Sequence, residues 1–146
     1  MTAIILVMEG NFDLVIFGGT GDLALRKLYP ALFLADCDGR LHASGRIIAA
    51  ARQTLDDDAF RVKVTEALQR FVPEVLKSAR PDCLARFLAR LTYFSLDVNS
   101  ASQYDTLKHA LDQRSSQKVF YLSVGPTLFP AIIGGLKQAG LNTAES

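Results

Sequence analysis

A glycine-rich run near the start of the chain has the residue types and the spacing that bind phosphate groups. It follows the pattern G-x-x-G-x-x-A and reads, in order, Gly18, Gly19, Thr20, Gly21, Asp22, Leu23 and Ala24. In this pattern Gly18 allows a tight turn, Gly21 lets a diphosphate approach the backbone, and Ala24 lets a helix pack closely on a strand. The N–H groups at the start of that helix then point at the anion. An ordinary strand-to-helix turn is the alternative, and the apolar residues 12–17 before the run favour nucleotide binding.

A basic residue after the second apolar run bears on which nucleotide would bind. Residues 46–51 read as a buried strand, and Arg52 and Gln53 follow it. NAD-binding sheets usually have an acidic residue here, which holds the ribose 2′-hydroxyl, whereas the next carboxylate in this chain is Asp56. A guanidinium suits a 2′-phosphate because it can bond two oxygens at once. The alternative is that Arg52 is an ordinary surface arginine. We favour a role in binding the 2′-phosphate of NADP, although the neutral Gln53 would not strongly exclude NAD.

Two other groups of residues have both a chemical and a structural interpretation. Tyr104 and Lys108 fit the Y-x-x-x-K pair of short-chain reductases, but the reductase pair follows a later strand, and pairs four residues apart are common on helices. Asp56, Asp57 and Asp58 could bind a metal, but carboxylates also gather in the first turn of a helix, where they cap free N–H groups. We favour the structural interpretation of both groups.

Apolar periodicity predicts strands and helices in regular alternation. Strands are predicted at residues 12–17, 46–51, 91–96 and 119–123. Helices are predicted at residues 23–35, 56–71, 84–89, 101–111 and 127–139, the last capped by Gly140. Such an order implies parallel strands with right-handed crossovers. The expected fold is α/β, a Rossmann-like doubly wound parallel sheet with helices on both faces. A sheet of this type normally has about six strands, so four readable strands indicate an incomplete sheet and a fragment.

Prolines and apolar positions predict further detail within the helical segments. Pro30 predicts a kink or a break near Lys27 in the first helix. Pro73 and Pro81 mark a connecting stretch after the second helix. Three residues of the second helix are expected to face the core: Val62, Leu68 and Phe71.

The length and composition are those of one soluble domain. The chain has 146 residues, of which 49% are hydrophobic and 21% charged, and its formal net charge is +1. We therefore expect no nucleic-acid partner and no attachment to a membrane. The apolar run at residues 4–8 is too short for a secretory signal or a membrane span, and residues 1–11 are interpreted as an N-terminal extension. Cys37 and Cys83 are expected to be reduced thiols of a cytoplasmic protein. The two histidines lie in no ligand-like cluster, so no metal site is expected.

Several segments together resemble the glucose-6-phosphate dehydrogenase family. Residues 17–30 are similar to its G-x-x-G-D-L-A-x-[KR]-K-x-x-P signature. Residues 51–53 read A-R-Q, as in family members, and Asp97 and Val98 follow the third strand in the family manner. Residues 120–126 continue the resemblance after the fourth strand. The segments occur in the family order and cover the chain from residue 12 onward, so that residues 12–146 are expected to form an NADP-binding domain.

The resemblance implies a role for each matched position. Residues 18–23 would wrap the diphosphate, with Thr20 near the 2′-phosphate. Arg52 and Gln53 would contact the adenosine ribose and its phosphate. Lys27 would reach toward the sugar phosphate and its reactive hydroxyl; taken without the family, it reads as a solvated lysine. The ends of the third and fourth strands would lie beside the cofactor, the fourth near its nicotinamide half, through Asp97, Val98, Ser123, Val124, Gly125 and Pro126. Gly125 stands where the family usually has alanine or leucine.

The family also has motifs that this sequence does not contain. Family members continue into an E-K-P-x-G strand, an R-I-D-H-Y-L-G-K stretch and a large antiparallel domain, which hold the general-base histidine, its aspartate and the dimer surface. The resemblance implies a parent enzyme that oxidises glucose 6-phosphate to 6-phosphogluconolactone with NADP, in the pentose phosphate pathway. We expect the isolated chain, which has no catalytic residue of its own, to be inactive, and we expect any homo-oligomer to need the missing domain. The alternative is a stand-alone NADP-binding module without catalysis.

Overall fold

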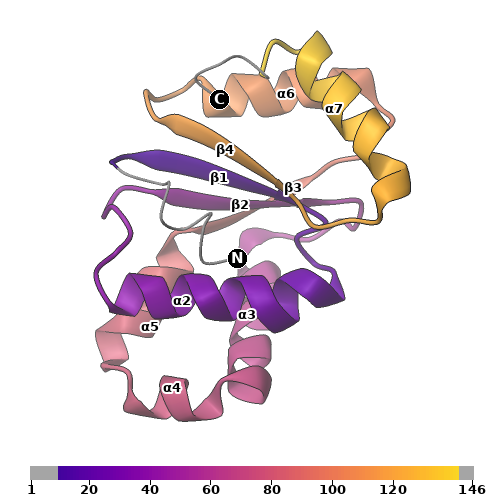
Figure 1. Ribbon diagram of the computed structural model, residues 1–146. Helices are drawn as coiled ribbons and strands as arrows, with labels where there is room; N and C mark the ends of the chain where they lie inside the picture. The colour runs from indigo at the N-terminus through magenta and orange to yellow at the C-terminus, as the bar shows by residue number, and fades with distance from the viewer. Residues whose placement is uncertain (1–9, 142–146) are drawn as a thin grey trace.

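Residues 10–141 are described by the computed structural model, and they form a four-stranded parallel sheet with helices on both faces (Figure 1). The strands are β1 (Phe12–Phe17), β2 (Arg46–Ala51), β3 (Leu91–Ser95) and β4 (Gln117–Leu122). The helical segments are the π-helical turn η1 (Ala24–Leu28), α2 (Tyr29–Cys37), α3 (Asp57–Phe71), α4 (Pro73–Ser78), α5 (Pro81–Ala89), α6 (Ala101–Leu111), the 3-10 turn η2 (Pro126–Leu128) and α7 (Phe129–Gln138). The predicted α/β fold is confirmed.

The order of the strands locates the place where a ligand would bind. The strands lie in the order β3-β2-β1-β4, so the chain adds strands on one side of β1 and then crosses to the other side. All pairs are parallel; for example, Val15 lies opposite Ile48 of β2 and Phe120 of β4. In open α/β sheets, ligands bind at the carboxyl ends of the strands where the strand order reverses. Here that place is formed by the loops after β1 and β4.

The central strand β1 is buried along its whole length because helices cover both faces of the sheet. Leu14 and Ile16 belong to a core cluster with side chains of α2, α3 and α5. Val15 and Phe17 belong to a second cluster with side chains of α6 and α7. Figure 1 shows these two groups of helices on opposite sides of the sheet. A strand covered on both faces reads as a nearly continuous apolar run, which is why β1 could be predicted.

Helix α3 differs from the prediction at one position. Leu68 is buried and Phe71 is half-buried, but Val62 is 55% exposed, so the prediction that Val62 faces the core was wrong. The buried stripe of this helix passes through Phe60 and Val64. Two residues advance a helix by about 200°, so Val62 lies on the face opposite Phe60. The apolar character of Val62 alone did not show which side of α3 faces the core.

Two prolines that were predicted to mark a connection instead begin helices. Helix α4 starts at Pro73 and α5 at Pro81, because proline in the first turn lacks an N–H that would have no partner there. The irregularity predicted near Lys27 is the π-helical turn η1, in which the N–H of Tyr29 donates to the carbonyl of Ala24. The helix continues through α2 without a break.

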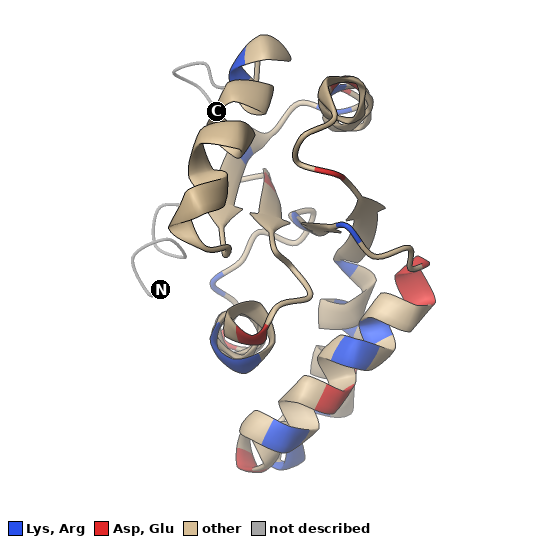
Figure 2. Ribbon diagram, turned by 90° about the vertical axis from the view of Figure 1, so that its right-hand side faces the viewer, with Lys and Arg blue, Asp and Glu red and all other residues tan. Residues whose placement is uncertain are grey.

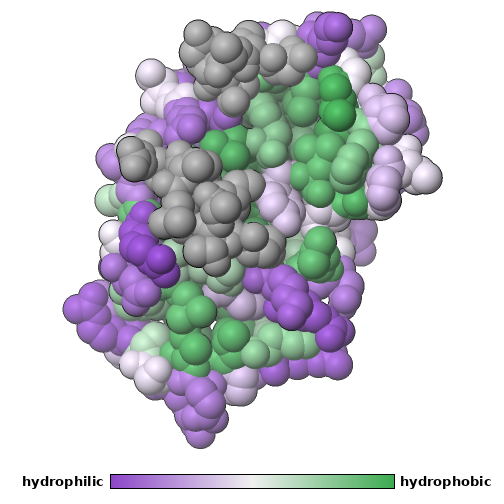
Figure 3. Space-filling model, viewed as in Figure 1, coloured by the Kyte–Doolittle hydropathy of each residue, from purple (hydrophilic) through white to green (hydrophobic). Residues whose placement is uncertain are grey.

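The last helix ends at the predicted glycine. Gly140 has φ +77°, and the N–H of Leu141 donates to the carbonyl of Leu136 at 2.8 Å, which closes the helix end. Ile133 is 52% exposed on α7, and Figure 3 shows a hydrophobic area over this helix. No helix within residues 10–141 is long and apolar enough to cross a membrane. The apolar run at residues 4–8 lies outside the described residues.

Candidate functional site

The loop after β1 is packed so closely against the sheet that two of its positions favour glycine. Gly18 has φ +76°, in the left-handed region, and a Cβ atom there would lie 2.7 Å from Cγ1 of Val124. A Cβ atom on Gly19 would lie 2.6 Å from Cβ of Ala49 in β2. The N–H groups of Gly18 and Gly19 both donate to the carbonyl of Ala50, at 2.9 and 3.3 Å. The tight turn predicted at Gly18 is confirmed, and it lies against the ends of β2 and β4.

The second half of this loop turns into the helix and leaves backbone N–H groups free. The N–H of Gly21 donates to the carbonyl of Gly18 at 3.0 Å. Among the described residues, no group accepts a hydrogen bond from the backbone N–H of Thr20, Asp22 or Leu23. Figure 2 looks onto this edge of the sheet, where the helix after β1 is seen end-on. Free N–H groups at the start of a helix attract phosphate, because the helix dipole adds to their partial positive charge.

Most side chains around this loop face outward. Leu23 is 49% exposed, and the exposed Asp22 forms an ion pair with Nε of Arg26 at 3.4 Å, one turn along the helix. Lys27 is exposed as well, and no acidic group within residues 10–141 lies within ion-pair distance of its ammonium. Ala24 is fully buried, which confirms the predicted close packing of helix on strand.

The loop after β2 contains Arg52 and Gln53, and β3 holds it in place. The carbonyl of Gln53 accepts a hydrogen bond from the Tyr93 hydroxyl at 2.6 Å, and that of Arg52 accepts one from Oγ of Ser95 at 3.4 Å. Both Arg52 and Gln53 are exposed. The Arg52 guanidinium has no acidic partner in the described part of the chain. Within residues 10–141 it is therefore an unpaired cation at the edge where the glycine-rich loop after β1 begins.

The residues after β3 are fixed by the helix that follows them. Asp97 and Val98 are half-buried. The N–H of Asp97 donates to Oε1 of Gln103 at 2.6 Å, and the carbonyl of Val98 accepts a hydrogen bond from the Tyr104 hydroxyl at 2.9 Å. Sequence reasoning did not predict that Gln103 positions this segment. Its spacing from Asp97 carried no recognisable pattern, because the contact depends on how α6 folds back.

The residues after β4 include a buried hydroxyl without a partner. Ser123 is 8% exposed, and no described residue forms a hydrogen bond with its Oγ. A buried polar atom in this state costs about 1–3 kcal/mol, so such atoms are few in folded proteins; the other one within residues 10–141 is Nη2 of Arg46, at the opposite edge of the sheet. Val124 is half-buried, and Gly125 and Pro126 are exposed. Gly125 has φ −62° and ψ 150°, extended backbone that alanine or leucine could also adopt.

The reductase-like interpretation of Tyr104 and Lys108 is excluded by their contacts. Tyr104 is 1% exposed, and burial together with the nearby Asp97 raises its pKa. Nζ of Lys108 pairs with Asp112 at 2.5 Å and makes no bond to the tyrosine hydroxyl. A catalytic tyrosine of that type has its hydroxyl beside the lysine ammonium, whereas here the hydroxyl donates to Val98 and the ammonium pairs with Asp112, so the structural interpretation is confirmed.

The three consecutive aspartates are also structural. Asp56 caps α3 by accepting a hydrogen bond from the N–H of Ala59 at 2.7 Å. Asp57 accepts one from the N–H of Tyr93 at 2.8 Å, and Asp58 pairs with Arg61. Their carboxylates thus serve separate partners. Among residues 10–141, no group of three His, Cys, Asp or Glu side chains is placed to hold a metal ion.

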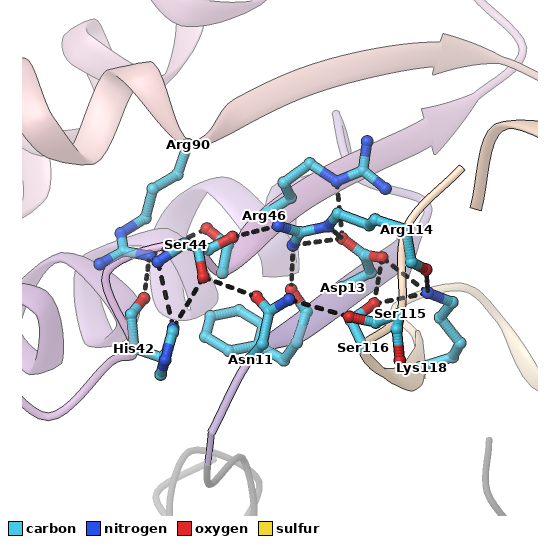
Figure 4. A network of polar contacts seen from close by, with 12 residues as sticks. Asn11, Asp13, His42, Ser44, Arg46, Arg90, Arg114, Ser115, Ser116 and Lys118 are labelled. Carbon is cyan, nitrogen blue, oxygen red and sulfur yellow. Dashed lines mark hydrogen bonds and ion pairs between the residues drawn. The ribbon is translucent and has the colours of Figure 1, made fainter. Parts of the chain in front are cut away.

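The opposite edge of the sheet holds a dense polar network around Asp13 (Figure 4). This carboxylate is fully buried and accepts hydrogen bonds from Arg46 at 2.6 Å, Arg114 at 2.7 Å, Ser116 at 2.6 Å and Lys118 at 3.0 Å. Burial alone raises the pKa of Asp13, but these four hydrogen bonds outweigh it and hold the pKa well below its usual range. The network lies at the amino ends of the strands, away from the loops described above.

The parts gathered at the carboxyl edge match what a phosphorylated dinucleotide requires. Within residues 10–141, the loop after β1 offers free N–H groups to a diphosphate, Arg52 offers an unpaired guanidinium, and Ser123 offers a buried hydroxyl without a partner. The loop after β1 and Ser123 lie at the strand-order reversal of a parallel sheet, and Arg52 follows the neighbouring strand β2. The fold and the site together define a dinucleotide-binding domain of the Rossmann type.

Comparison with known proteins places this domain in one family. Residues 15–146 match the family described as the NAD binding domain of glucose-6-phosphate dehydrogenase. The chain therefore belongs to the glucose-6-phosphate dehydrogenase family and corresponds to its N-terminal cofactor-binding domain.

Individual relatives agree with this assignment. The chain is 46% identical, over 92% of its length, to glucose-6-phosphate 1-dehydrogenase of Mycolicibacterium smegmatis, and 34% identical, over 93%, to that of Leuconostoc mesenteroides. It spans 28% of the length of each of these relatives. Among solved structures, a glucose-6-phosphate dehydrogenase in complex with glucose 6-phosphate superimposes with a TM-score of 0.81, with 28% identity over 94% of this chain and 29% of the other. The enzyme from Mycobacterium avium gives a TM-score of 0.78, with 29% identity over 91% of this chain and 28% of the other.

Proposed function

We propose that this domain binds NADP at the carboxyl edge of its sheet, within a protein that oxidises glucose 6-phosphate to 6-phosphogluconolactone. The observation that carries the proposal combines two features of the described part of the chain, the free N–H groups at the start of the first helix and the unpaired guanidinium of Arg52. Residues 18–23 would hold the diphosphate, and Arg52 and Gln53 the adenosine 2′-phosphate. The segments after β3 and β4, with Asp97, Val98, Ser123, Val124, Gly125 and Pro126, would line the rest of the cofactor.

The chemical step needs groups that this edge does not supply. The bound nicotinamide would accept a hydride from C1 of the sugar, and a general base would have to remove the hydroxyl proton within hydrogen-bond reach. The Nδ1 atom of His42 accepts a hydrogen bond from the N–H of Ser44 at the opposite edge, and His109 contacts Gln113 on the outside of α6. Neither lies near residues 18–23. Lys27, exposed on the helix after the loop, is proposed to reach the sugar phosphate.

The test of cofactor binding is a titration of the purified protein with NADP and with NAD, compared with the Arg52→Ala variant. Losing a charge-assisted bond to the 2′-phosphate should weaken NADP binding about 10- to 100-fold, while NAD binding stays unchanged. Arg40→Ala is the matched control, because Arg40 is also exposed but pairs with Asp38 at the far end of α2. An Arg52→Ala variant that binds NADP as tightly as the parent would refute the 2′-phosphate assignment.

The test of catalysis is NADPH formation from glucose 6-phosphate. We expect turnover from the complete gene product and none from residues 1–146 alone, because neither histidine of the described residues lies near residues 18–23. Cofactor binding without turnover in the complete gene product would favour the alternative, a binding module without chemistry.

The proposal includes a cytoplasmic location, which two free cysteines support. Burial and the adjacent Cys83 thiol raise the pKa of Cys37 to about 12, so this thiol stays protonated.

A further inference from the structure

Two tyrosines make the same kind of contact with the loops after β1 and β2, which we propose bind the diphosphate and the 2′-phosphate. The hydroxyl of Tyr29, the first residue of α2, donates to the carbonyl of Gly19 at 2.6 Å. The hydroxyl of Tyr93, in β3, donates to the carbonyl of Gln53 at 2.6 Å. Each tyrosine thus fixes the position of one backbone carbonyl in its loop.

A phenylalanine connects the two tyrosines into one aromatic stack. The ring of Phe60, in α3, lies 5.7 Å from the Tyr29 ring in an edge-on arrangement. The same ring lies 5.6 Å from the Tyr93 ring, tilted by 38°. Tyr29 and Phe60 are fully buried, and Tyr93 is half-buried. Aromatic pairs at these distances have preferred geometries, so the three rings hold one another in position. The stack therefore joins three segments, α2, α3 and β3, beneath the two loops.

The bond to Gln53 bears directly on Arg52. The loop after β2 is exposed, and its hydrogen bonds to β3 come from Tyr93 and Ser95. A long arginine side chain loses conformational freedom when it binds a phosphate, and the free-energy cost is larger when its backbone is also free to move. A fixed backbone at Gln53 reduces that cost. The reduction favours a ligand with a 2′-phosphate, because NAD has no 2′-phosphate for the guanidinium to pair with.

We propose that Tyr93 is the positioning residue for recognition of the 2′-phosphate, and that Tyr29 positions the diphosphate loop, through the shared contact with Phe60. This inference rests on the proposed function, since it assumes that Arg52 meets the 2′-phosphate and residues 18–23 the diphosphate. It goes further by assigning coenzyme selectivity partly to a tyrosine that would not touch the coenzyme.

The test compares Tyr93→Phe and Tyr29→Phe by titration with NADP and with NAD. Each substitution removes one hydroxyl and keeps the ring, and losing one such bond corresponds to roughly a three- to ten-fold change in Kd. For Tyr93→Phe we expect this loss for NADP and none for NAD. For Tyr29→Phe we expect the same loss for both coenzymes, because both contain the diphosphate. A merely structural role of Tyr93 would move both Kd values together.

Two further variants make the outcome decisive. Thr65→Val is the matched control, because the Thr65 hydroxyl also donates to a backbone carbonyl, at 2.8 Å, but within α3; both Kd values should stay unchanged. Ser95→Ala removes the weaker bond to Arg52 from an exposed side chain and should produce a smaller loss of the same NADP-selective kind. If Tyr93→Phe weakened the binding of both coenzymes equally, or of neither, the inference would be overturned. The proposed function would still stand if Arg52→Ala weakened NADP binding. If Arg52→Ala left the Kd for NADP unchanged, the proposed function itself would fail.

Discussion

The two edges of the sheet use charged residues in opposite ways. At the amino edge, the buried carboxylate of Asp13 is surrounded by Arg46, Arg114 and Lys118, all within 3.0 Å. At the carboxyl edge, Arg52 and Lys27 are exposed, and neither forms an ion pair in the described part of the chain. The amino edge pairs its charges within the protein, whereas the carboxyl edge leaves these two cations unpaired, as the proposed binding of NADP and of the sugar phosphate would require.

This difference separates residues that stabilise the fold from residues that we propose bind a ligand. The same amino edge includes Asp36, which receives two parallel bonds from Arg90 at 2.9 and 3.0 Å. Buried charges need such partners, because an unpaired one costs several kcal/mol. Exposed cations need none, because water solvates them. Substitutions at the amino edge should therefore lower stability, and those of exposed cations at the carboxyl edge should lower affinity.

The largest expected effect is that of Asp13→Asn. Removing the charge leaves Arg46, Arg114 and Lys118 facing one another around a buried amide, and breaking a buried ion network in this way costs about 3–5 kcal/mol. Denaturant unfolding measures the loss, with Asp58→Asn as the control, because Asp58 is 94% exposed in its pair with Arg61. At denaturant concentrations below the unfolding transition, the affinity for NADP should not change. A loss no larger than that of the control would remove the contrast between the two edges.

The next largest effect is that of Gly18→Ala at the carboxyl edge. This substitution should lower both the free energy of unfolding and the affinity for the cofactor. A side chain at φ +76° is strained, and its Cβ would collide with the backbone of Ser123. Together these costs are about 2–4 kcal/mol. Gly134→Ala is the control, since no atom lies within 4 Å of the added Cβ, and alanine should stabilise α7 by about 0.5–1 kcal/mol. If both variants unfolded alike, the loop would not be packed as described.

A smaller effect should appear in acid. The folded-state pKa of Asp13 lies well below its usual range, so its stabilisation is complete above the unfolded-state pKa of about 3.9 and is lost as pH falls toward the folded-state value. The loss is roughly 1.4 kcal/mol for each pH unit below that point. Near pH 3, the difference in unfolding free energy between the parent and Asp13→Asn should thus shrink by about 1 kcal/mol relative to pH 7. A difference that grows in acid would have the wrong sign.

Sequence reasoning predicted the features that depend on neighbouring residues. The buried strand β1 and the turn at Gly18 follow from a local pattern, apolar residues and then glycine, and both are confirmed. The helix at Pro73 was missed, and the orientation of Val62 was wrong, because both depend on packing against other segments.

The supports of the candidate site were harder to predict for the same reason. The bond from Tyr29 to Gly19 joins residues ten positions apart, and the one from Tyr93 to Gln53 joins residues forty positions apart. No spacing in the sequence marks either pair. The signal that remained was weak: a tyrosine in a strand that also carries polar residues needs a partner for its hydroxyl. The residues expected to touch the cofactor could be named, whereas the residues that hold them in place required the structure.

The smallest effect on stability should come from Lys27→Gln. Its ammonium has no ion-pair partner within residues 10–141, so the unfolding free energy should change by less than about 0.5 kcal/mol. Arg26→Gln is the adjacent control, because Arg26 pairs with Asp22 and lies 5.2 Å from the centre of the Phe71 ring. The two variants should differ in function, because we propose that Lys27 alone reaches the sugar phosphate. In the complete gene product, Lys27→Gln should raise the KM for glucose 6-phosphate without changing the Kd of NADP. If its main effect were instead on unfolding, an exposed cation of the carboxyl edge would serve the fold, and the division between the two edges would not hold.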